Sequence, residues 1–554
     1  MDIKELLKAE IRQAVEQAIA DGAFSAGNLP EIILEVPPQK EFGDYATNFA
    51  MQTARAAKAN PRIIASAIVE RLKAPWLDRA VIAGPGFINF YLKSDWLYEM
   101  LQKILDAGKQ YGNTTAGKGQ RVQIEFVSAN PTGPLHVGHG RGAAVGSALA
   151  NLLKAAGYQV ESEYYINDAG NQIDNLAASV NARYLELLGQ PVTFPEDGYH
   201  GQDIVDTAQR LIAKNGRKYL ELGAAERLEL FKEIALAEKL EALKEDLSAF
   251  NVHFDVWYSE RTLHQSGAIT ETCKVLQENG NIYEKDGALW LKSTAYGDDK
   301  DRVVIRDNGI PTYLAADIAY HRDKFRRGFD KLINIWGADH HGYICRVKAA
   351  SAALGYEAEN LEVLILQMVS LFRNGELVKM SKRTGQSVTL SELMEEVGRD
   401  AARFFFIMRS IDSQLDFDLD LAKSRSNENP VYYIQYAHAR IASIFRQVTE
   451  AGVNYDSKTP LNLSLLIEEA EVDLIKKLGE YPEEISSAAN ERAPHRLARY
   501  VHELASLFHT FYNQCRIIGV DKDLQLARLA LVNAVRNCIG HSLNILGIEA
   551  PDKM

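Results

Sequence analysis

The chain has 554 residues, which is too long for one hydrophobic core and indicates three or four domains. Its hydrophobic content of 46% and charged content of 25% are typical of a globular protein and exclude a disordered or fibrous chain. The formal net charge of −12 excludes a protein coated in basic surface, although a local basic track could still bind a polyanion.

The four cysteines (Cys273, Cys345, Cys515 and Cys538) are widely scattered and form no C-x-x-C pair. This spacing favours reduced thiols over a zinc knuckle or a redox motif. The first residues are charged and amphipathic, unlike a signal peptide, and no apolar stretch approaches the ~20 residues of a membrane span. We therefore expect a soluble, cytoplasmic protein that does not contact a membrane.

The N-terminal part alternates between helical and strand patterns. Apolar spacing predicts a helix over residues 2–21, a strand over 31–36, a helix over 47–72, and a strand pattern over 81–91 that is interrupted by Gly-Pro-Gly. Together these elements indicate a small α+β domain. The polar, glycine-rich segment 106–120 is typical of a linker.

From residue 121 the pattern changes to that of a βαβ unit, with a strand over 122–127, a helix over 136–156 and a strand over 160–166. A similar alternation returns later in the chain. Its predicted elements are strands over 303–306, 331–336 and 361–371 and helices over 314–327 and 341–354.

This alternation of strands and helices predicts an α/β core, a doubly wound parallel sheet whose two halves are separated by an insertion at roughly 180–300. From about residue 429 helical patterns dominate, which indicates an all-α helical bundle. The predicted domains are 1–110, 120–425 and 426–554.

The first strand of the core leads through a loop into residues 136–139 (HVGH) at a predicted helix start, where free N–H groups and the helix dipole favour phosphate. His136 and His139 lie on one face of the first turn, where imidazole donors can follow phosphate oxygens. Gly138 leaves room for a flat adenine against its backbone.

Other interpretations of this segment stay open on the residues alone. His-x-x-His could be half of a metal site, although no third ligand has suitable local spacing. Gly140, Gly142 and Gly146 could belong to a dinucleotide fingerprint, but a long loop separates them from the strand. Simple helix-packing glycines would explain the glycines but not the histidines.

A second candidate element is residues 379–383 (KMSKR). Two lysines three positions apart, Lys379 and Lys382, are mobile point charges that can close over a triphosphate. The alternative is a solvated basic loop. The two elements together are far more specific than either alone.

With HVGH and KMSKR, the sequence resembles the class I aminoacyl-tRNA synthetases, whose signatures are HIGH and KMSKS. Residues 125–131 (EFVSANP), 164–172 (YYINDAGNQ), 312–317 (TYLAAD) and 336–342 (WGADHHG) narrow the resemblance to the bacterial arginyl-tRNA synthetases. Residues 41–48 (EFGDYATN) are similar to the extra N-terminal domain of that family.

The resemblance implies a Rossmann-like, HUP-type core that ligates L-arginine to tRNA(Arg) through an arginyl-adenylate, with ATP as substrate and Mg2+ as its companion ion. It also implies that tRNA binds before the adenylate forms, and a monomer is the usual state in the family. No dedicated protein metal site is expected.

The resemblance also assigns roles residue by residue. The catalytic residues are His136, His139, Lys379 and Lys382. The predicted ATP-binding residues are Pro134, Gly138, Gly140, Asp168, Gly337, Asp339, Met380 and Ser381. The predicted arginine-binding residues are Glu125, Ser128, Asn130, Tyr313, Asp317 and His340. At the last of these positions many relatives have Gln in place of His340.

The chemistry of arginine agrees with two of these residues. A guanidinium presents five donors, so its pocket needs carboxylate and hydroxyl acceptors, and Tyr313 and Asp317 lie at i and i+4 on one helix face. An ordinary exposed Tyr-x-x-x-Asp pair is the alternative. Asp168 could hold ribose or ammonium, or simply cap a helix.

In the C-terminal part, residues 432–440 (YYIQYAHAR) interleave aromatic and basic side chains on a predicted helix. Unstacked anticodon bases are commonly bound by such side chains, although tyrosines in the core of a bundle would give the same pattern. Two other functions remain as rivals: a small-molecule adenylyltransferase, which would lack the flanking domains, and a catalytically idle tRNA-binding paralogue, against which the intact histidines and lysines argue.

Overall fold

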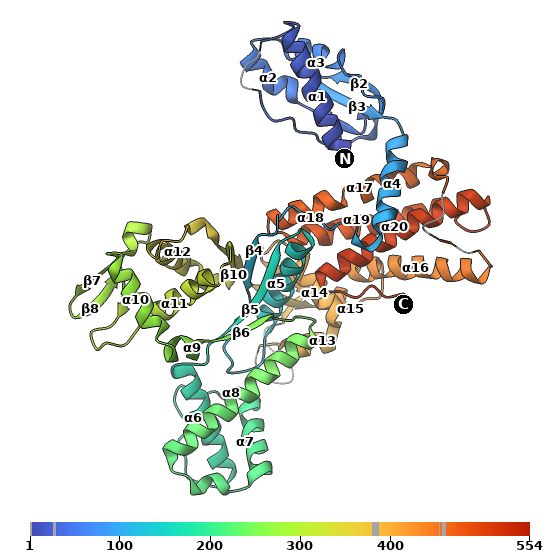
Figure 1. The fold of residues 1–554 in the computed structure, drawn as a ribbon. Helices are drawn as coiled ribbons and strands as arrows, with labels where there is room; N and C mark the ends of the chain where they lie inside the picture. Colours follow the sequence, from blue (N-terminus) through green and yellow to red (C-terminus); the bar gives the residue numbers. More distant parts are fainter. Residues whose placement is uncertain (1–2, 26–28, 379–386, 454, 457–460) are drawn as a thin grey trace. The chain divides into compact units, whose positions relative to one another are not determined.

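The structure is a computed structural model that describes residues 3–25, 29–378, 387–453, 455–456 and 461–554 (Figure 1). The chain forms two compact units. One unit comprises Met1–Ala107, Tyr455–Gly479 and Gln514–Ala534, and the other comprises Gly108–Asn454, Glu480–Asn513 and Val535–Met554.

The first unit contains an antiparallel three-stranded sheet in the order β1-β3-β2 together with helices, which confirms the predicted N-terminal α+β fold. Its elements are α1 (Ile3–Ala20), β1 (Tyr45–Thr47), α2 (Phe49–Ala57), α3 (Pro61–Val69), β2 (Leu77–Ala83), β3 (Phe87–Leu92), α4 (Asp95–Ala107) and α17 (Glu469–Gly479). Helix α1 buries Leu7, Ile11 and Ala18 at helical spacing, so one apolar stripe anchors it.

Two predictions for this region are wrong. Residues 31–36 form no strand, and only Glu35 pairs with Ala46, in an isolated bridge that cannot extend past residue 36 because the two prolines that follow have no N–H to donate. The predicted helix over 47–72 is two helices, because Asn60 caps a new helix by accepting from the Arg62 N–H and Pro61 occupies its first position.

The second unit is built around a five-stranded parallel sheet in the order β11-β10-β4-β5-β6. Its strands are β4 (Arg121–Glu125), β5 (Gln159–Ile166), β6 (Val256–Ser259), β10 (Lys331–Gly337) and β11 (Leu361–Leu366). Counted along the chain, this is the order 3-2-1-4-5, which confirms the doubly wound fold. The strand order reverses between β4 and β10, where ligands bind in such sheets.

Helices and two small sheets surround this central sheet (Figure 1). Those before β10 are α5 (Val137–Ala155), α6 (Asn171–Leu187), α7 (Gln202–Asn215), α8 (Ala224–Ala249), α9 (Glu260–Gln265), α10 (Ala268–Glu278), β7 (Ile282–Lys285), β8 (Ala288–Leu291), β9 (Arg302–Ile305) and α11 (Tyr313–Arg326). Those after it are α12 (Ile344–Ala353), β12 (Val369–Arg373), β13 (Glu376–Val378), α13 (Leu390–Val397), α14 (Arg399–Ile407), β14 (Leu415–Asp418) and α15 (Leu419–Lys423).

The C-terminal elements are helical, as predicted: α16 (Pro430–Glu450), α18 (Tyr481–Asn490), α19 (Pro494–Gln514) and α20 (Lys522–Leu546), the last with residues in both units. No helix in the described part of the chain is long and apolar enough to cross a membrane.

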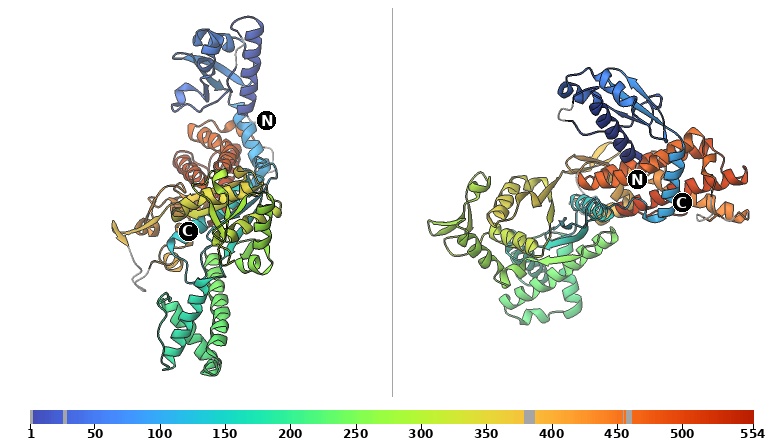
Figure 2. Two further views of the ribbon diagram at one scale, coloured as in Figure 1. Left: turned by 90° about the vertical axis from the view of Figure 1, so that its left-hand side faces the viewer. Right: turned by 45° about the horizontal axis from the view of Figure 1, so that its top comes forward.

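The second half of the core differs from the predicted pattern. Strand β6 lies within the expected insertion and returns to the central sheet, while α6, α7 and α8 pack together as a bundle (Figure 2). Strand β9 belongs to the antiparallel sheet β7-β8-β9. The strand predicted over 361–371 divides into β11 and β12, which lie in different sheets, because Gln367 leaves the ladder and donates to the Ile411 carbonyl.

Arg403, in α14, lies wholly inside the second unit. Its guanidinium donates to the carbonyls of Leu546 (2.9 and 3.0 Å) and Phe250 (2.9 Å) and to the Ser147 hydroxyl (2.8 Å). Burial without a carboxylate partner lowers the pKa of Arg403 to about 9. One side chain thus ties together the ends of α8 and α20 and the middle of α5.

Gly146 of α5 should be intolerant of any side chain. A Cβ there would lie 2.3 Å from Cγ of the buried Phe126, so Gly146→Ala is expected to destabilise the second unit by about 1–3 kcal/mol despite the better helix propensity of alanine. The measurement is the unfolding temperature. Gly142→Ala in the same helix is the control, because its Cβ would meet only Leu366 at 3.5 Å and its stability should stay equal or rise. Equal unfolding temperatures for the two variants would contradict the prediction.

Candidate active site

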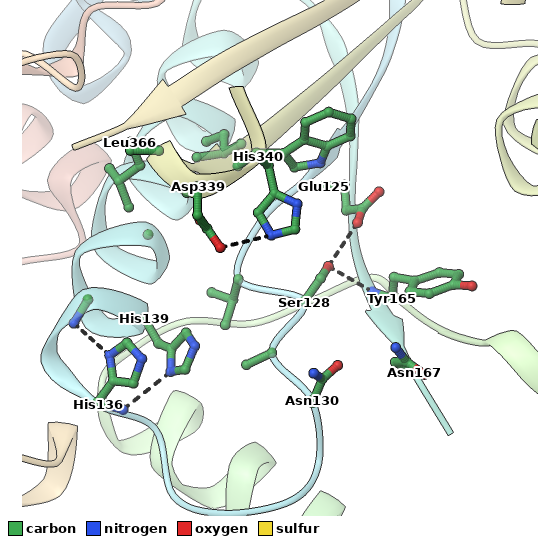
Figure 3. Close-up of a pocket in the computed structure, with 18 of the residues that line it drawn as sticks. Glu125, Ser128, Asn130, His136, His139, Tyr165, Asn167, Asp339, His340 and Leu366 are labelled. Atoms are coloured by element: carbon green, nitrogen blue, oxygen red, sulfur yellow. Dashed lines mark hydrogen bonds and ion pairs between the residues drawn. The ribbon is translucent and has the colours of Figure 1, made fainter. Parts of the chain in front are cut away.

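A cavity of about 770 Å³ opens at the carboxyl ends of β4, β5, β10 and β11, at the point where the strand order reverses (Figure 3). Most of the residues predicted to bind substrates line it. They are Glu125, Ser128, Asn130, His136, Gly138, His139, Asp317, Gly337, Asp339 and His340. The structure therefore brings residues from four strand ends and two helices around one space.

The chain is strained where β4 ends beside this cavity. Val127 has a φ of 66° and Ser128 a φ of 41°, a region that costs a non-glycine residue about 1–3 kcal/mol. The turn places the Ser128 hydroxyl between two partners: it donates to Glu125 Oε1 (3.0 Å) and accepts from the Tyr165 N–H (3.1 Å) (Figure 3). This strained turn fixes the orientation of the Glu125 carboxylate.

His136 and His139 form a stacked pair at the N-terminus of α5, with ring centroids 3.7 Å apart. His136 Nδ1 accepts from the Gly138 N–H (3.1 Å), and His139 Nδ1 accepts from the His136 N–H (3.3 Å) (Figure 3). Both Nδ1 atoms are acceptors, so in the neutral rings each Nε2 carries the proton. Burial lowers the pKa of both rings, that of His139 to about 4 with help from the neighbouring His136.

The glycines of this motif have different neighbours. A Cβ on Gly138 would lie 2.9 Å from Cε1 of His136, so the glycine makes room for the imidazole that lies over it. Gly140 is buried, and a Cβ there would meet Leu390 at 2.8 Å. Gly140 does not line the cavity.

The segment that follows residue 386 is joined to the entry of α5. The Leu390 N–H donates to the Leu135 carbonyl (2.7 Å), and the Val137 N–H donates to the Val388 carbonyl (3.2 Å). Between these bonds, His136 and Thr389 pair in an isolated antiparallel β-bridge. The predicted residues Lys379, Met380, Ser381 and Lys382 lie outside the described residues.

Asp317 of α11 is half-buried and lines the cavity. The Tyr343 hydroxyl donates to its Oδ2 (2.5 Å). Burial raises the pKa of this carboxyl to about 7, against the effect of the Tyr343 hydrogen bond, and the neighbouring Glu260 and Glu125 raise it further. No Lys or Arg among the described residues forms an ion pair with it.

Glu260, a buried carboxylate that follows β6 directly, was not predicted from the sequence. Burial raises its pKa, while hydrogen bonds from His264 and Tyr165 lower it. The available signal was a short aromatic and β-branched run, Val256–Ser259, followed by an acid, which is typical of a strand end in a parallel sheet.

Three other predicted residues lie outside the cavity lining. Pro134 is exposed, and Tyr313 is 65% exposed near Gly170. Asp168 is buried and accepts from the Ser259 hydroxyl (2.6 Å) and the Arg261 N–H (3.0 Å), so its carboxylate fastens the loop after β5 to the start of α9.

At the rim, the exposed His340 and Asp339 side chains lie 3.4 Å apart (Figure 3). The described residues contain no group of three or more His, Cys, Asp or Glu arranged to hold a metal ion. Among the described residues, the site thus has paired imidazole donors on one side and, on the other, carboxylates that form no ion pair with Lys or Arg.

Comparison with known families matches three segments of the chain. Residues 100–410 match the catalytic domain of class I (R) tRNA synthetases, residues 5–92 match the arginyl tRNA synthetase N terminal domain, and residues 434–554 match the DALR anticodon binding domain.

Individual proteins match over the whole chain. It is 56% identical over 538 residues to an arginine–tRNA ligase of Carboxydothermus hydrogenoformans, covering 97% of each chain. It is 54% identical over 558 residues to arginine–tRNA ligase 1 of Halalkalibacterium halodurans, covering 100% of each. The solved arginyl-tRNA synthetase of Thermus thermophilus has a TM-score of 0.75 at 24% identity, covering 99% of this chain and 100% of its own, and so shares the fold.

Proposed function

The chain belongs to the arginyl-tRNA synthetases and charges tRNA with arginine at the expense of ATP, and on this premise we propose how its residues divide the work. In the first step the arginine carboxylate attacks the α-phosphorus of ATP and diphosphate leaves. In the second, a hydroxyl of the terminal adenosine of tRNA attacks the arginyl carbonyl and AMP leaves. Neither step needs a covalent bond to the enzyme.

His136 and His139 serve the nucleotide. Each neutral ring presents an Nε2–H donor, and the pair lies at the N-terminus of α5, where the positive end of the helix dipole favours phosphate. Such preorganised donors stabilise negative charge that develops on phosphate oxygens during transfer. We assign Lys379 and Lys382 to the same task by resemblance.

The arginine side is supported by one observation above all: Asp317 and Glu260 are carboxylates in or beside the cavity without a Lys or Arg partner among the described residues. Leaving two acids together in low dielectric is costly, and a planar cation with five donors relieves that cost. Asp317, with Glu260 beside it, is therefore assigned to the guanidinium. The exposed Asn130 and His340 at the cavity wall are assigned to the polar groups of the amino acid.

Mg2+ would enter with the ATP phosphates and would neutralise the departing diphosphate. The exposed carboxylate of Asp339, which lines the cavity, would help to hold it. The four free cysteines are consistent with a reducing cytoplasm. We propose a monomer, because that is the usual state in the family.

For tRNA we assign the half-buried aromatic face of α16. Tyr432 and Tyr436 stack with centroids 6.2 Å apart, and the Arg440 guanidinium lies 4.5 Å from the rings of both Tyr436 and Tyr512. Stacked aromatic rings beside an arginine can accept unstacked bases.

Arginine-dependent exchange of labelled diphosphate into ATP tests the reaction. Exchange is expected only when tRNA(Arg) is present, because we propose that tRNA binds before the adenylate forms. A tRNA for another amino acid is the control. Exchange without tRNA would overturn the order of binding, and its absence in every case would overturn the assignment of the cavity to adenylate formation.

A further inference from the structure

Two glutamates lie side by side beneath the arginine side of the cavity. Glu125 of β4 and Glu163 of β5 are direct partners in the parallel register, and both are buried. Like charges at neighbouring buried positions repel each other strongly unless cations neutralise them.

Both cations come from α11, the helix that carries Asp317. Arg327, the residue after its last turn, donates to both oxygens of Glu163 (2.6 and 3.0 Å), and Tyr320 also donates to Glu163. Lys324 donates to Glu125 Oε2 (2.5 Å). Each acid of the pair therefore has its own cation.

Lys324 is unusual for a lysine because its side chain is completely inaccessible to solvent. Besides Glu125, its ammonium donates to Asn334 Oδ1 of β10 (3.0 Å) and lies 4.3 Å from the centre of the Tyr320 ring. All of its neighbours thus come from the core of the active-site unit.

A directed chain of hydrogen bonds continues from Lys324 to the backbone carbonyl of Asp317. Asn334 Nδ2 bonds to His321 Nε2 (2.8 Å), and His321 Nδ1 bonds to the Asp317 carbonyl (2.8 Å). Burial lowers the pKa of His321 to about 3, so the ring is neutral, and only the tautomer with its proton on Nδ1 satisfies both bonds. Asp317, His321 and Lys324 occupy one face of α11.

We propose that Lys324 is a positioning residue for arginine recognition: it neutralises Glu125, holds that carboxylate against Ser128, and so leaves Asp317 and Glu260 as the acids that the guanidinium must balance. The proposal rests on the assignment of Asp317 to the arginine side chain. Lys324 touches no substrate in this scheme, and its effect passes through the charge and placement of the residues around it.

The charge of Lys324 has a measurable consequence at Asp317. That carboxyl is faced by Tyr343, by Glu260 of α9, by Glu125 of β4, by Tyr165 of β5, and by Lys324 of its own helix, while His321 bonds to the backbone carbonyl of the same residue. Below its pKa of about 7 the carboxyl is protonated in the free protein, and guanidinium binding must expel that proton. The ratio kcat/KM for arginine should therefore rise with pH and level off above about pH 7.

Lys324→Met removes the positive charge and leaves Glu125 negative, so the pKa of Asp317 rises. The midpoint of the pH profile is expected to move up by about one pH unit, which lowers kcat/KM at pH 6 by about tenfold relative to the wild type. Glu125→Gln is expected to move the midpoint down. The double variant Glu125→Gln/Lys324→Met should return near the wild-type midpoint, and it avoids leaving a buried charge unpaired if the single variant folds poorly.

Two variants separate this role from a merely structural one. Lys324→Arg keeps the charge and is expected to keep the wild-type midpoint even if KM rises. Lys331→Met breaks another lysine–glutamate pair of the same sheet, with Glu362 at 3.0 Å, and should lower the unfolding temperature without moving the midpoint.

An unmoved midpoint in Lys324→Met, or single variants whose shifts do not cancel in the double variant, would overturn the proposal. Failure of the underlying site assignment has a different signature, because Asp317→Asn would then leave both the arginine KM and the pH profile unchanged. If Asp317→Asn abolishes the rise of kcat/KM with pH while Lys324→Met leaves its midpoint unchanged, the result supports the assignment of Asp317 and contradicts the role of Lys324.

Discussion

Asp317→Ala is expected to raise the KM for arginine by about 10²- to 5 × 10³-fold while the KM for ATP changes by no more than about twofold. Removing one partner of a buried charge pair costs about 3–5 kcal/mol, because the remaining charge stays desolvated and uncompensated. In the wild type that partner is the arginine guanidinium, so the cost appears only when arginine binds. Steady-state charging of tRNA, with each substrate varied in turn, measures both constants.

Two controls make this result specific. Asp323→Ala changes a half-buried acid of the same helix, whose carboxylate pairs with Arg327, and should leave the arginine KM near that of the wild type. Asp317→Asn should unfold at no lower temperature than the wild type, because the raised pKa of Asp317 means that its ionised form destabilises the folded state above about pH 4. Equal increases in the KM for arginine and for ATP would remove Asp317 from the guanidinium site.

Replacing either histidine of the stacked pair is expected to lower kcat by about 10²- to 10³-fold with little change in the arginine KM. Loss of one preorganised donor to a developing oxyanion costs about 2.7–4 kcal/mol, and this loss falls on the transition state. The double variant should be little worse than each single variant, because the rings act as a unit. Single-turnover formation of the adenylate in the presence of tRNA is the measurement.

His136 also caps α5, so a structural role must be separated from a catalytic one. Asn is among the best N-cap residues, and in His136→Asn its side chain can still accept from the Gly138 N–H although the Nε2 donor is lost. We therefore expect His136→Asn to keep the wild-type unfolding temperature and still lose activity. Near-normal activity in this variant would show that His136 serves the helix alone.

The features that the sequence predicted well depend on neighbours in the chain. The helix after HVGH begins at a local cap, His136, and Asp317 stands one turn from the start of a predicted helix, although its role in binding arginine stays a prediction. The order of the parallel strands follows from their alternation with helices, which leaves few possible topologies.

The features that it missed depend on distant partners. Lys324 resembles any surface lysine until Glu125, 199 positions away, is brought beside it. Glu260 follows a strand of four residues that joins the sheet only because β5, about 90 positions earlier, offers an edge to it. In both cases the local pattern was too short or too ordinary to predict burial, and the tertiary pairing decided it.

The position of Arg403 bears on the modularity of the protein. The family matches at 100–410 and 434–554 suggest two modules that could be exchanged between proteins, yet this guanidinium in the first depends on the Leu546 carbonyl in the second. A fragment cut between them would lose two hydrogen bonds of this guanidinium together with the packing of α20 around it. The last turn of α20 therefore acts structurally as part of the catalytic module, and a catalytic fragment without that turn is expected to be less stable than the whole chain.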